Sequence, residues 1–321
     1  MSTLPSGISI VVPAYNSGEI LPQLVERLET VLVASGQPFE LILVNDGGRD
    51  QTWSVIQNFG RAKPWVRGLC MMRNYGQHNA LLAGIRAARF DTTVTMDDDL
   101  QHPPEELPRL LAQLSADLDV VYAPPEREQH GLLRDLGSVV TKMALQSAMG
   151  ARTARMVSAW RVFRTQLREA FASFHSPFVS IDVLLTWATT KFGAIPLRHE
   201  PRTVGKSNYT VWKLIRHALN MMTGFSVVPL QFASIVGFAF TVFGVGILSY
   251  VLVNYFVHGS SVAGFPFLAS IIAVFSGAQL FALGILGEYL ARMHFRTMDK
   301  PSYVVREKTA AITAETSTKQ S

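Results

Sequence analysis

The sequence has a single cysteine and little charge for its length. Cys70 is alone among 321 residues, which excludes an internal disulfide framework and fits a reducing compartment. It lies in the apolar run VRGLCMM, where we expect a buried structural thiol rather than a reactive one. Charged residues make up 17% of the chain and hydrophobic residues 48%, which is more apolar than an average soluble protein.

Charge is missing altogether from two long segments. No Asp, Glu, Lys or Arg occurs at 229–257 or at 265–287, and each segment exceeds the ~20 residues that an α-helix needs to cross a bilayer. A buried core helix would explain one such segment, but two in succession favour a membrane hairpin. The sequence therefore predicts two transmembrane helices, at about 229–257 and 265–290.

The basic residues predict how this hairpin is oriented. Lys and Arg are absent from the connector HGSSVAG but occur on both outer flanks, at Lys206, Lys213, Arg216, Arg292, Arg296, Lys300 and Arg306. The positive-inside rule puts such flanks in the cytoplasm. A strand-like run begins close to the N-terminus, without a signal-peptide pattern before it. We therefore expect a multi-pass protein of the inner (plasma) membrane.

The same pattern predicts four parts along the chain. We expect a cytoplasmic domain at 1–207, the two membrane helices within 229–291 and a cytoplasmic tail at 292–321. Between them, residues 208–228 have apolar residues on one helical face, which suits a helix lying in the membrane interface. An ordinary amphipathic helix packed on the domain is the alternative for that segment.

Within the first part, strand-like runs alternate with helical patterns. The runs are ISIVVPAYN, ELILVNDGG, VRGLCMMR, TTVTMDDD and DVVYAPP, and each is followed by a segment with helical periodicity. This alternation predicts an α/β fold with βαβ units and a mostly parallel sheet covered by helices on both faces. The runs are continuously apolar, as strands buried on both sides are.

Polar residues follow the first four of these runs. They are Asn16, Asp46, Arg73 with Asn74, and Asp97–Asp99. In open α/β sheets, ligands bind beyond the carboxyl ends of the strands. The sequence therefore predicts a binding site where these four strands end.

The stretch MDDDLQHPPEE contains an Asp-x-Asp pair, Asp97 and Asp99. Carboxylate oxygens are suitable ligands for Mg²⁺ or Mn²⁺. Without a cation, adjacent buried carboxylates would have their pKa values raised by mutual repulsion and desolvation. A solvated acidic turn is the alternative, because Asp-x-Asp by itself is a common pattern.

These motifs together resemble the family-two glycosyltransferases of the GT-A fold. The resemblance is carried by VVPAYN, VNDGGRDQT, RNYGQHNALLAGI, MDDDLQHPPEE and HEPRTVGKSNYTVWKLI, followed by two membrane helices that end in LGEYLAR. This order is similar to that of polyprenyl-phosphate glycosyltransferases, which include dolichol-phosphate mannosyltransferases, O-antigen glucosyl-carrier transferases and aminoarabinose undecaprenyl-phosphate transferases. It extends from Ile8 to about Val305.

The resemblance implies roles on the donor side. Asp97 and Asp99 would hold Mg²⁺ or Mn²⁺ on the donor diphosphate, with Gln101 as the polar residue beyond them, and Asp46 would contact the nucleotide base. The remaining residues of the nucleotide-sugar side are Pro13, Tyr15, Asn16, Arg73, Asn74 and Asp98. Pro13 is equally explained as a strand terminator. Asp98 stands where the family often has a small residue, and we expect it to point away from the metal.

The resemblance also implies roles on the acceptor side. Arg127, Arg134 and Ser138 match acceptor-phosphate positions, and Arg202 matches the family pattern Arg-x-x-Gly-x-Ser-x-Tyr. Arginine suits this role because it binds phosphate in a bidentate manner. A solvated surface charge is the alternative for each of these arginines.

The chain departs from the family in two places. In the base-binding motif, Asn45 and Gly48 replace an Asp and a Ser. In ARMVSAWRVFR, Arg155 and Val157 occupy the positions of a usual Asp-x-Gly. Asp182 is a candidate for the missing carboxylate, although an acidic residue at a helix N-terminus explains it equally well. The second departure puts the sugar in question more than the reaction class.

The resemblance implies an enzyme. It would be a metal-dependent, inverting glycosyltransferase that moves a sugar from a nucleotide, by expectation UDP, to polyprenyl (undecaprenyl) phosphate. The reaction would take place at the cytoplasmic face of the membrane and would serve cell-envelope glycans such as lipopolysaccharide. One alternative is another lipid or glycan acceptor, and another is an inactive membrane scaffold that binds nucleotide-sugars. We expect the donor, the lipid acceptor and the membrane as partners, with no nucleic acid and with self-association as an open alternative. The net charge of +5 is modest and by itself fits nucleic acid, anionic lipid or a phosphate-bearing substrate, so its distribution along the chain decides.

Overall fold

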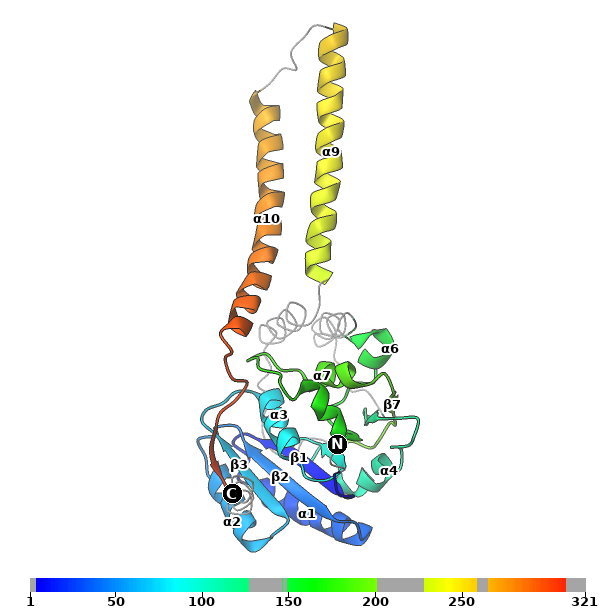
Figure 1. Ribbon diagram of the computed structural model, residues 1–321, viewed down its shortest axis with the longest axis vertical. Helices are drawn as coiled ribbons and strands as arrows, with labels where there is room; N and C mark the ends of the chain where they lie inside the picture. Colours follow the sequence, from blue (N-terminus) through cyan, green and yellow to red (C-terminus); the bar gives the residue numbers. More distant parts are fainter. Residues whose placement is uncertain (1–3, 127–145, 147–148, 201–227, 259–264, 310–321) are drawn as a thin grey trace.

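The computed structural model describes residues 4–126, 146, 149–200, 228–258 and 265–309. An α/β domain lies at one end, and two long helices project from it side by side (Figure 1). The predicted interfacial segment at 208–228 lies almost entirely outside the described residues, as does the tail beyond Thr309.

One eight-stranded sheet forms the centre of the domain, in the order β7-β5-β6-β4-β1-β2-β3-β8. The strands are β1 (Ile8–Ala14), β2 (Phe39–Asn45), β3 (Val66–Met71), β4 (Thr92–Thr95), β5 (Val120–Tyr122), β6 (Arg161–Arg164), β7 (Phe192–Ala194) and β8 (Val305–Lys308). β4, β1, β2 and β3 are parallel neighbours. The mostly parallel sheet predicted from the sequence is confirmed, and its first four strands are those that the apolar runs predicted.

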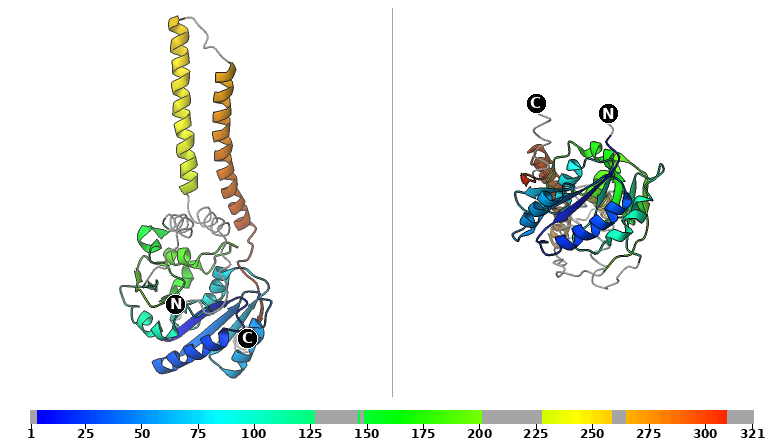
Figure 2. Two further views of the ribbon diagram at one scale, coloured as in Figure 1. Left: turned by 180° about the vertical axis from the view of Figure 1, so that it is seen from behind. Right: turned by 90° about the horizontal axis from the view of Figure 1, so that it is seen from below.

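Helices cover both faces of the sheet, as Figure 2 shows from below. They are α1 (Leu21–Ser35), α2 (Thr52–Ala62), α3 (Gln77–Ala87), α4 (Leu107–Leu111), α6 (Ala151–Ala154) and α7 (Ile181–Ala188), with 3-10 turns η1 (Pro104–Glu106) and η2 (Thr165–Phe171). Strand β1 shows why two faces form, because side chains alternate along a strand. Ile10 and Val12 pack with α1, whereas Val11 packs with α3 and α7.

Two strands that the sequence did not predict run antiparallel to their neighbours. β6 is antiparallel to both β4 and β5, and β8 is antiparallel to β3. β8 follows the long helices, so the chain returns from them to the sheet edge, where Val305 lies beside Met71 at the carboxyl end of β3. Thr309 continues this contact, because its hydroxyl accepts a hydrogen bond from the Gly68 N–H at 3.0 Å.

The two uncharged segments are helices α9 (Val228–His258) and α10 (Phe265–Thr297). Val228–Asn254 and Val274–His294 are long and apolar enough to cross a membrane. Their mutual contact includes Phe275, whose ring lies 5.6 Å from that of Phe240. The predicted C-terminal pair of apolar helices is thus confirmed as a candidate membrane hairpin.

Contacts at the base of α10 join the hairpin to the domain. The Arg292 guanidinium lies 4.8 Å from the centre of the Phe178 ring. Beyond the helix, the Ser302 hydroxyl accepts a hydrogen bond from the Ser176 N–H at 3.1 Å. The hairpin is therefore tied to the domain through α10, the segment after it and β8.

Candidate active site

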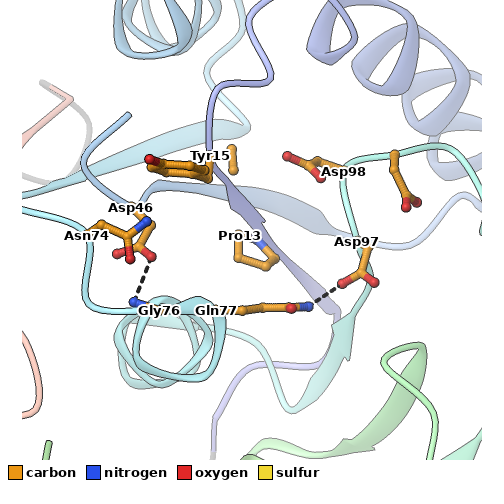
Figure 3. A pocket seen from close by; sticks show the side chains of 10 residues that line it. Pro13, Tyr15, Asp46, Asn74, Gly76, Gln77, Asp97 and Asp98 are labelled. Atoms are coloured by element: carbon orange, nitrogen blue, oxygen red, sulfur yellow. Dashed lines mark hydrogen bonds between the residues drawn. The ribbon is translucent and has the colours of Figure 1, made fainter. Parts of the chain in front are cut away.

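The carboxyl ends of the parallel strands surround a cavity of about 290 Å³. Its lining comes from the ends of β1, β2 and β4 and from the start of α3: Pro13, Ala14, Tyr15, Asp46, Asn74, Gly76, Gln77 and Asp97–Asp99 (Figure 3). Residues that are more than eighty positions apart in the sequence, such as Pro13 and Asp99, meet here because parallel strands end at the same edge. We call this space the donor cavity.

The three consecutive carboxylates have three different partners. Asp97 Oδ1 accepts a hydrogen bond from Gln77 Nε2 at 2.6 Å, and Asp98 Oδ2 accepts one from the Ser17 hydroxyl. Asp99 is buried, and its Oδ1 accepts from the Gln101 N–H at 3.1 Å. The three side chains therefore leave the loop in different directions, and they are not equivalent acids.

Burial makes ionisation of two cavity carboxyls less favourable. Burial raises the pKa of Asp98, and the charge of Asp99 acts in the same direction, while the hydrogen bond from Ser17 lowers it. Burial also raises the pKa of Asp46, against the effect of two backbone amides. Those amides, from Tyr75 and Gly76, each donate to the Asp46 carboxylate at 2.8 Å. Asp46 therefore also fixes the turn between β3 and α3.

The charged side chains among the described residues of the cavity wall are all acidic. Four carboxyl groups line it, and no Lys or Arg is among the described residues of the lining. Within the described part of the chain, no three His, Cys, Asp or Glu side chains converge to complete a metal site by themselves. Magnesium commonly binds through one or two carboxylates plus phosphate oxygens and water. The donor set therefore fits a cation that is held jointly with an anionic ligand.

A second cavity, of about 430 Å³, adjoins the first. Tyr15 and Asn74 line both spaces, and Arg73 lines only the second. The wall of the second cavity also includes Arg49 and Arg306, so the segment of β8 contributes to it. The exposed Tyr15 ring thus stands between an acidic cavity and a basic one.

A buried aromatic group supports the loop of Asp97–Asp99 from behind. His102 Nδ1 accepts a hydrogen bond from the Asp97 N–H at 3.2 Å, and its ring is stacked on Trp160 with centroids 5.2 Å apart. The His199 ring is 5.0 Å from that of His102. Burial, followed by the effects of His199 and Arg161, lowers the pKa of His102 to about 3. The ring is therefore neutral at neutral pH.

Asp182 lies in the first turn of α7, as an acidic N-terminal residue would. Its Oδ1 pairs with the Arg161 guanidinium and accepts a hydrogen bond from the Tyr122 hydroxyl at 3.1 Å. Asp182 lines neither cavity. At the two positions where the family usually has Asp-x-Gly, Arg155 is exposed and Val157 packs against the core. A helix-terminal role for Asp182 therefore agrees with the geometry better than a role in orienting the sugar.

The structure brings together most of the predicted donor-side residues. Pro13, Tyr15, Asp46, Asn74 and Asp97–Asp99 share the donor cavity, and Arg73 lines the neighbouring one. Asn16 and Gln101 line neither. Asn16 instead accepts a hydrogen bond from the Arg49 N–H at 2.9 Å. The predicted acceptor residues Arg127, Arg134, Ser138 and Arg202 lie outside the described residues.

Several residues of the site were not predicted. Gln77 and Gly76 line the cavity, whereas Ser17 and His102 contact the acidic loop from outside its lining. Gln77 and His102 lie inside motifs that the sequence had singled out, so their positions carried a signal. Ser17 carried none, because its contact depends on how two loops meet. Cys70 is buried, as predicted, and burial raises the pKa of its thiol.

Comparison with known proteins identifies the family. Residues 9–171 match glycosyl transferase family 2. The chain is 32% identical to undecaprenyl-phosphate 4-deoxy-4-formamido-L-arabinose transferase of Shewanella sediminis, over 94% of this chain and 92% of that protein. The protein of the same name from Pectobacterium atrosepticum is 31% identical, over 95% and 94%.

The fold has a solved counterpart. Glucosyl-3-phosphoglycerate synthase from Mycobacterium tuberculosis, crystallised with Mn²⁺, UDP and phosphoglyceric acid, superimposes with a TM-score of 0.50 at 18% identity, covering 68% of this chain and 76% of that one. At this identity the likeness concerns the fold. Together with the sequence matches it confirms the expected resemblance: the chain belongs to glycosyl transferase family 2.

Proposed function

We propose that this glycosyltransferase moves a sugar from a nucleotide-sugar, UDP-linked by preference, to a polyprenyl phosphate such as undecaprenyl phosphate. The reaction takes place at the cytoplasmic face of the inner membrane and supplies a lipid-linked sugar for modification of cell-envelope glycans. The observation that carries the proposal is the acidic cavity at the carboxyl edge of the sheet, in a chain that also has a candidate membrane hairpin. The names of the relatives support the acceptor.

The donor occupies the donor cavity in this proposal. The Tyr15 ring, half exposed at the cavity mouth, offers a flat surface for the nucleotide base. Asp46 and Asn74 offer polar groups beside it. The diphosphate then lies next to Asp97 and Asp99, the carboxylates that follow β4. Each assignment extends a prediction from the sequence to a position in the cavity.

The acidic wall requires a cation if a diphosphate is to bind there. Asp97 and Asp99 would hold Mg²⁺ or Mn²⁺, and a bound divalent ion supplies Lewis-acid stabilisation of the departing nucleoside diphosphate. The Mn²⁺ and UDP of the structural counterpart are consistent with this assignment. Gln77 keeps Asp97 oriented through its 2.6 Å hydrogen bond, and His102 holds the backbone of the same residue.

The acceptor needs positioning more than activation. A phosphate monoester has a second pKa of ~6 and is already largely ionised at neutral pH. Its oxygen displaces the nucleoside diphosphate at the anomeric carbon in line, with inversion, so one C–O bond forms as the other breaks. Correct placement is then the main contribution of the protein. Arg127, Arg134, Ser138 and Arg202 remain the proposed phosphate ligands, and the hairpin would hold the domain at the headgroup level.

A transfer assay tests the proposal. Membranes that contain the full chain are incubated with undecaprenyl phosphate, Mn²⁺ or Mg²⁺ and a panel of nucleotide-sugars, and the lipid fraction is analysed by mass spectrometry. We expect the mass of one sugar to be added from at least one donor, and EDTA to prevent the addition. If no donor in the panel yields a glycosyl-phosphate lipid, the proposed acceptor is wrong.

A further inference from the structure

Two loops that face each other across the donor cavity contain residues in an uncommon backbone conformation. Asn16, in the loop after β1, has φ of 54°, and Leu100, directly after Asp99, has φ of 58°. Positive φ is uncommon for residues other than glycine and is more costly for a branched side chain such as leucine. Such conformations persist where surrounding contacts fix them, and they are frequent at ligand sites.

The Ser17 hydroxyl joins these two loops, and the Tyr15 N–H adds a second link, because as a backbone hydrogen-bond donor it lowers the pKa of Asp98. The Ser17 Oγ donates a hydrogen bond to Asp98 Oδ2 and accepts one from the Tyr15 N–H at 3.1 Å. The Ser17 N–H in turn donates to the Thr52 hydroxyl at 2.8 Å. Tyr15 and Asp98 both line the donor cavity, so Ser17 connects two of its walls from behind.

The direction of Asp98 separates it from the proposed metal ligands. In Figure 3, Asp97 points toward Gln77, whereas Asp98 extends on the other side, toward the loop of Tyr15. The carboxylate of Asp98 is thus committed to a contact between loops. The contact with Ser17 gives a reason for an acidic residue at position 98, which we do not expect to bind the metal.

We propose that Ser17 and Asp98 form a clamp that positions the two loops of the donor cavity and thereby sets the affinity for the nucleotide part of the donor. The inference rests on the proposed function, because it names residues that serve the same donor. Ser17 and Asp98 are positioning residues: they act through Tyr15 and through the loop that carries Asp97 and Asp99.

Removing the hydroxyl has two local consequences. In Ser17→Ala, the Asp98 carboxylate loses a donor and the Tyr15 N–H loses an acceptor. We expect the donor KM to rise about tenfold, the effect of removing one hydrogen bond to a charged group. The acceptor KM and kcat should stay within roughly twofold, since the interaction serves donor binding in the ground state and the transition state alike.

The test is a double-mutant cycle on the full chain in detergent or nanodiscs. Ser17→Ala, Asp98→Ala and the double variant are compared for donor KM, acceptor KM and the dissociation constant of UDP, with GDP and dTDP measured in parallel. The clamp predicts that the double variant is no weaker than either single variant, because the residues act as a pair. Ser17→Thr keeps the hydroxyl and should restore donor binding, and the exchange Ser17→Asp with Asp98→Ser should restore part of it.

Ser115→Ala provides a matched control. The Ser115 hydroxyl also accepts a backbone hydrogen bond two residues away, from the Asp117 N–H at 3.3 Å, but it lies on an exposed turn and lines neither cavity. Its donor KM should equal that of the wild type. Melting temperatures show whether each variant folds. If Ser17→Ala does not fold, Asp98→Ala tests the clamp in its place.

The outcomes separate the clamp from the proposed function. Unchanged donor KM in both single variants, or additive losses in the double variant, would overturn the clamp while wild-type transfer continues. A rise in acceptor KM of the same size would also overturn it. Absence of transfer by the wild-type protein, with no binding of any of the three nucleotides, would instead contradict the proposed function.

Discussion

Buried acidic residues have opposite surroundings at the amino edge of the central sheet, where the parallel strands begin, and at its carboxyl edge, where they end. At the amino edge, Glu40 is fully buried, and its Oε2 lies 2.5 Å from Arg67 Nη1 and 3.0 Å from Arg89 Nε. Its Oε1 accepts a hydrogen bond from the Ser9 hydroxyl at 2.7 Å. This carboxylate is neutralised entirely within the protein, as a buried charge must be if the fold is to remain stable.

At the carboxyl edge the acidic residues line a cavity instead. Asp46 and Asp97–Asp99 face it without a Lys or Arg among the described lining residues. Among the described residues, the Gln77 amide and the Gln101 N–H, both neutral, donate hydrogen bonds to Asp97 and Asp99. The same sheet can therefore neutralise a buried acid, and it does so where no ligand is needed. At the other edge the carboxylates line the cavity in which we propose that the cation binds.

The strongest test of this contrast removes the acid at the amino edge. Glu40→Ala removes the carboxylate that pairs with the buried Arg67, and removal of one member of a buried ion pair costs about 3–5 kcal/mol of unfolding free energy. We expect a loss of that size in chemical or thermal denaturation. Glu29→Ala serves as the control, because its 2.6 Å pair with Lys63 is partly exposed and such pairs contribute about 0–1 kcal/mol. If both variants lost the same unfolding free energy, the buried Glu40 pair would contribute no more to stability than the partly exposed Glu29 pair, and the contrast would fail.

The matching change at the carboxyl edge should affect activity rather than stability. Asp99→Asn removes one proposed metal ligand at nearly constant shape. We expect sugar transfer to fall roughly 100-fold or more, the scale on which electrostatic stabilisation of a leaving group contributes. The melting temperature should stay close to that of the wild type. A variant that keeps full activity would show that Asp99 does not serve the reaction.

A smaller effect concerns the histidine beneath the acidic loop. The pKa of His102 is lowered from 6.5 to about 3, so the unfolded chain binds a proton below pH 6.5 while the folded protein does not. Stability is therefore lost as the pH falls from 6.5 toward 3, by about 2 kcal/mol at pH 5 for this group. His102→Gln should show a flatter decline between pH 7 and pH 5 in thermal denaturation. An equally steep decline would assign the acid sensitivity to other groups.

The sequence predicted the central part of this arrangement for a physical reason. Strands β1 to β4 are buried on both faces, so each is rich in apolar or β-branched residues, and a polar residue marks where each strand ends. That pattern located Asp46 and Asp97–Asp99 before any contact was known. It also located the candidate membrane hairpin, because an uncharged segment of that length is long enough to span the hydrocarbon of a bilayer as a helix.

What the sequence did not predict depends on contacts between distant segments. β8 reads VREK, a short charged stretch, and it is a strand because the chain returns from α10 to the free edge of β3. Close packing fixes it there: a Cβ on Gly68 would lie 2.8 Å from Thr309 Cγ2. The contact of Ser17 with Asp98 also joins two segments that are distant in the sequence, and no sequence pattern indicates that these two residues meet.

The decisive measurement is the affinity of the full chain for UDP with and without Mn²⁺, determined by calorimetry on the wild type and on Asp99→Asn. If the acidic cavity binds a nucleoside diphosphate only together with a cation, Mn²⁺ should strengthen UDP binding to the wild type at least about tenfold. Asp99→Asn should lose this gain, as removal of a charged ligand implies. Equal UDP affinity with and without Mn²⁺, in both proteins, would contradict a cation-dependent donor site.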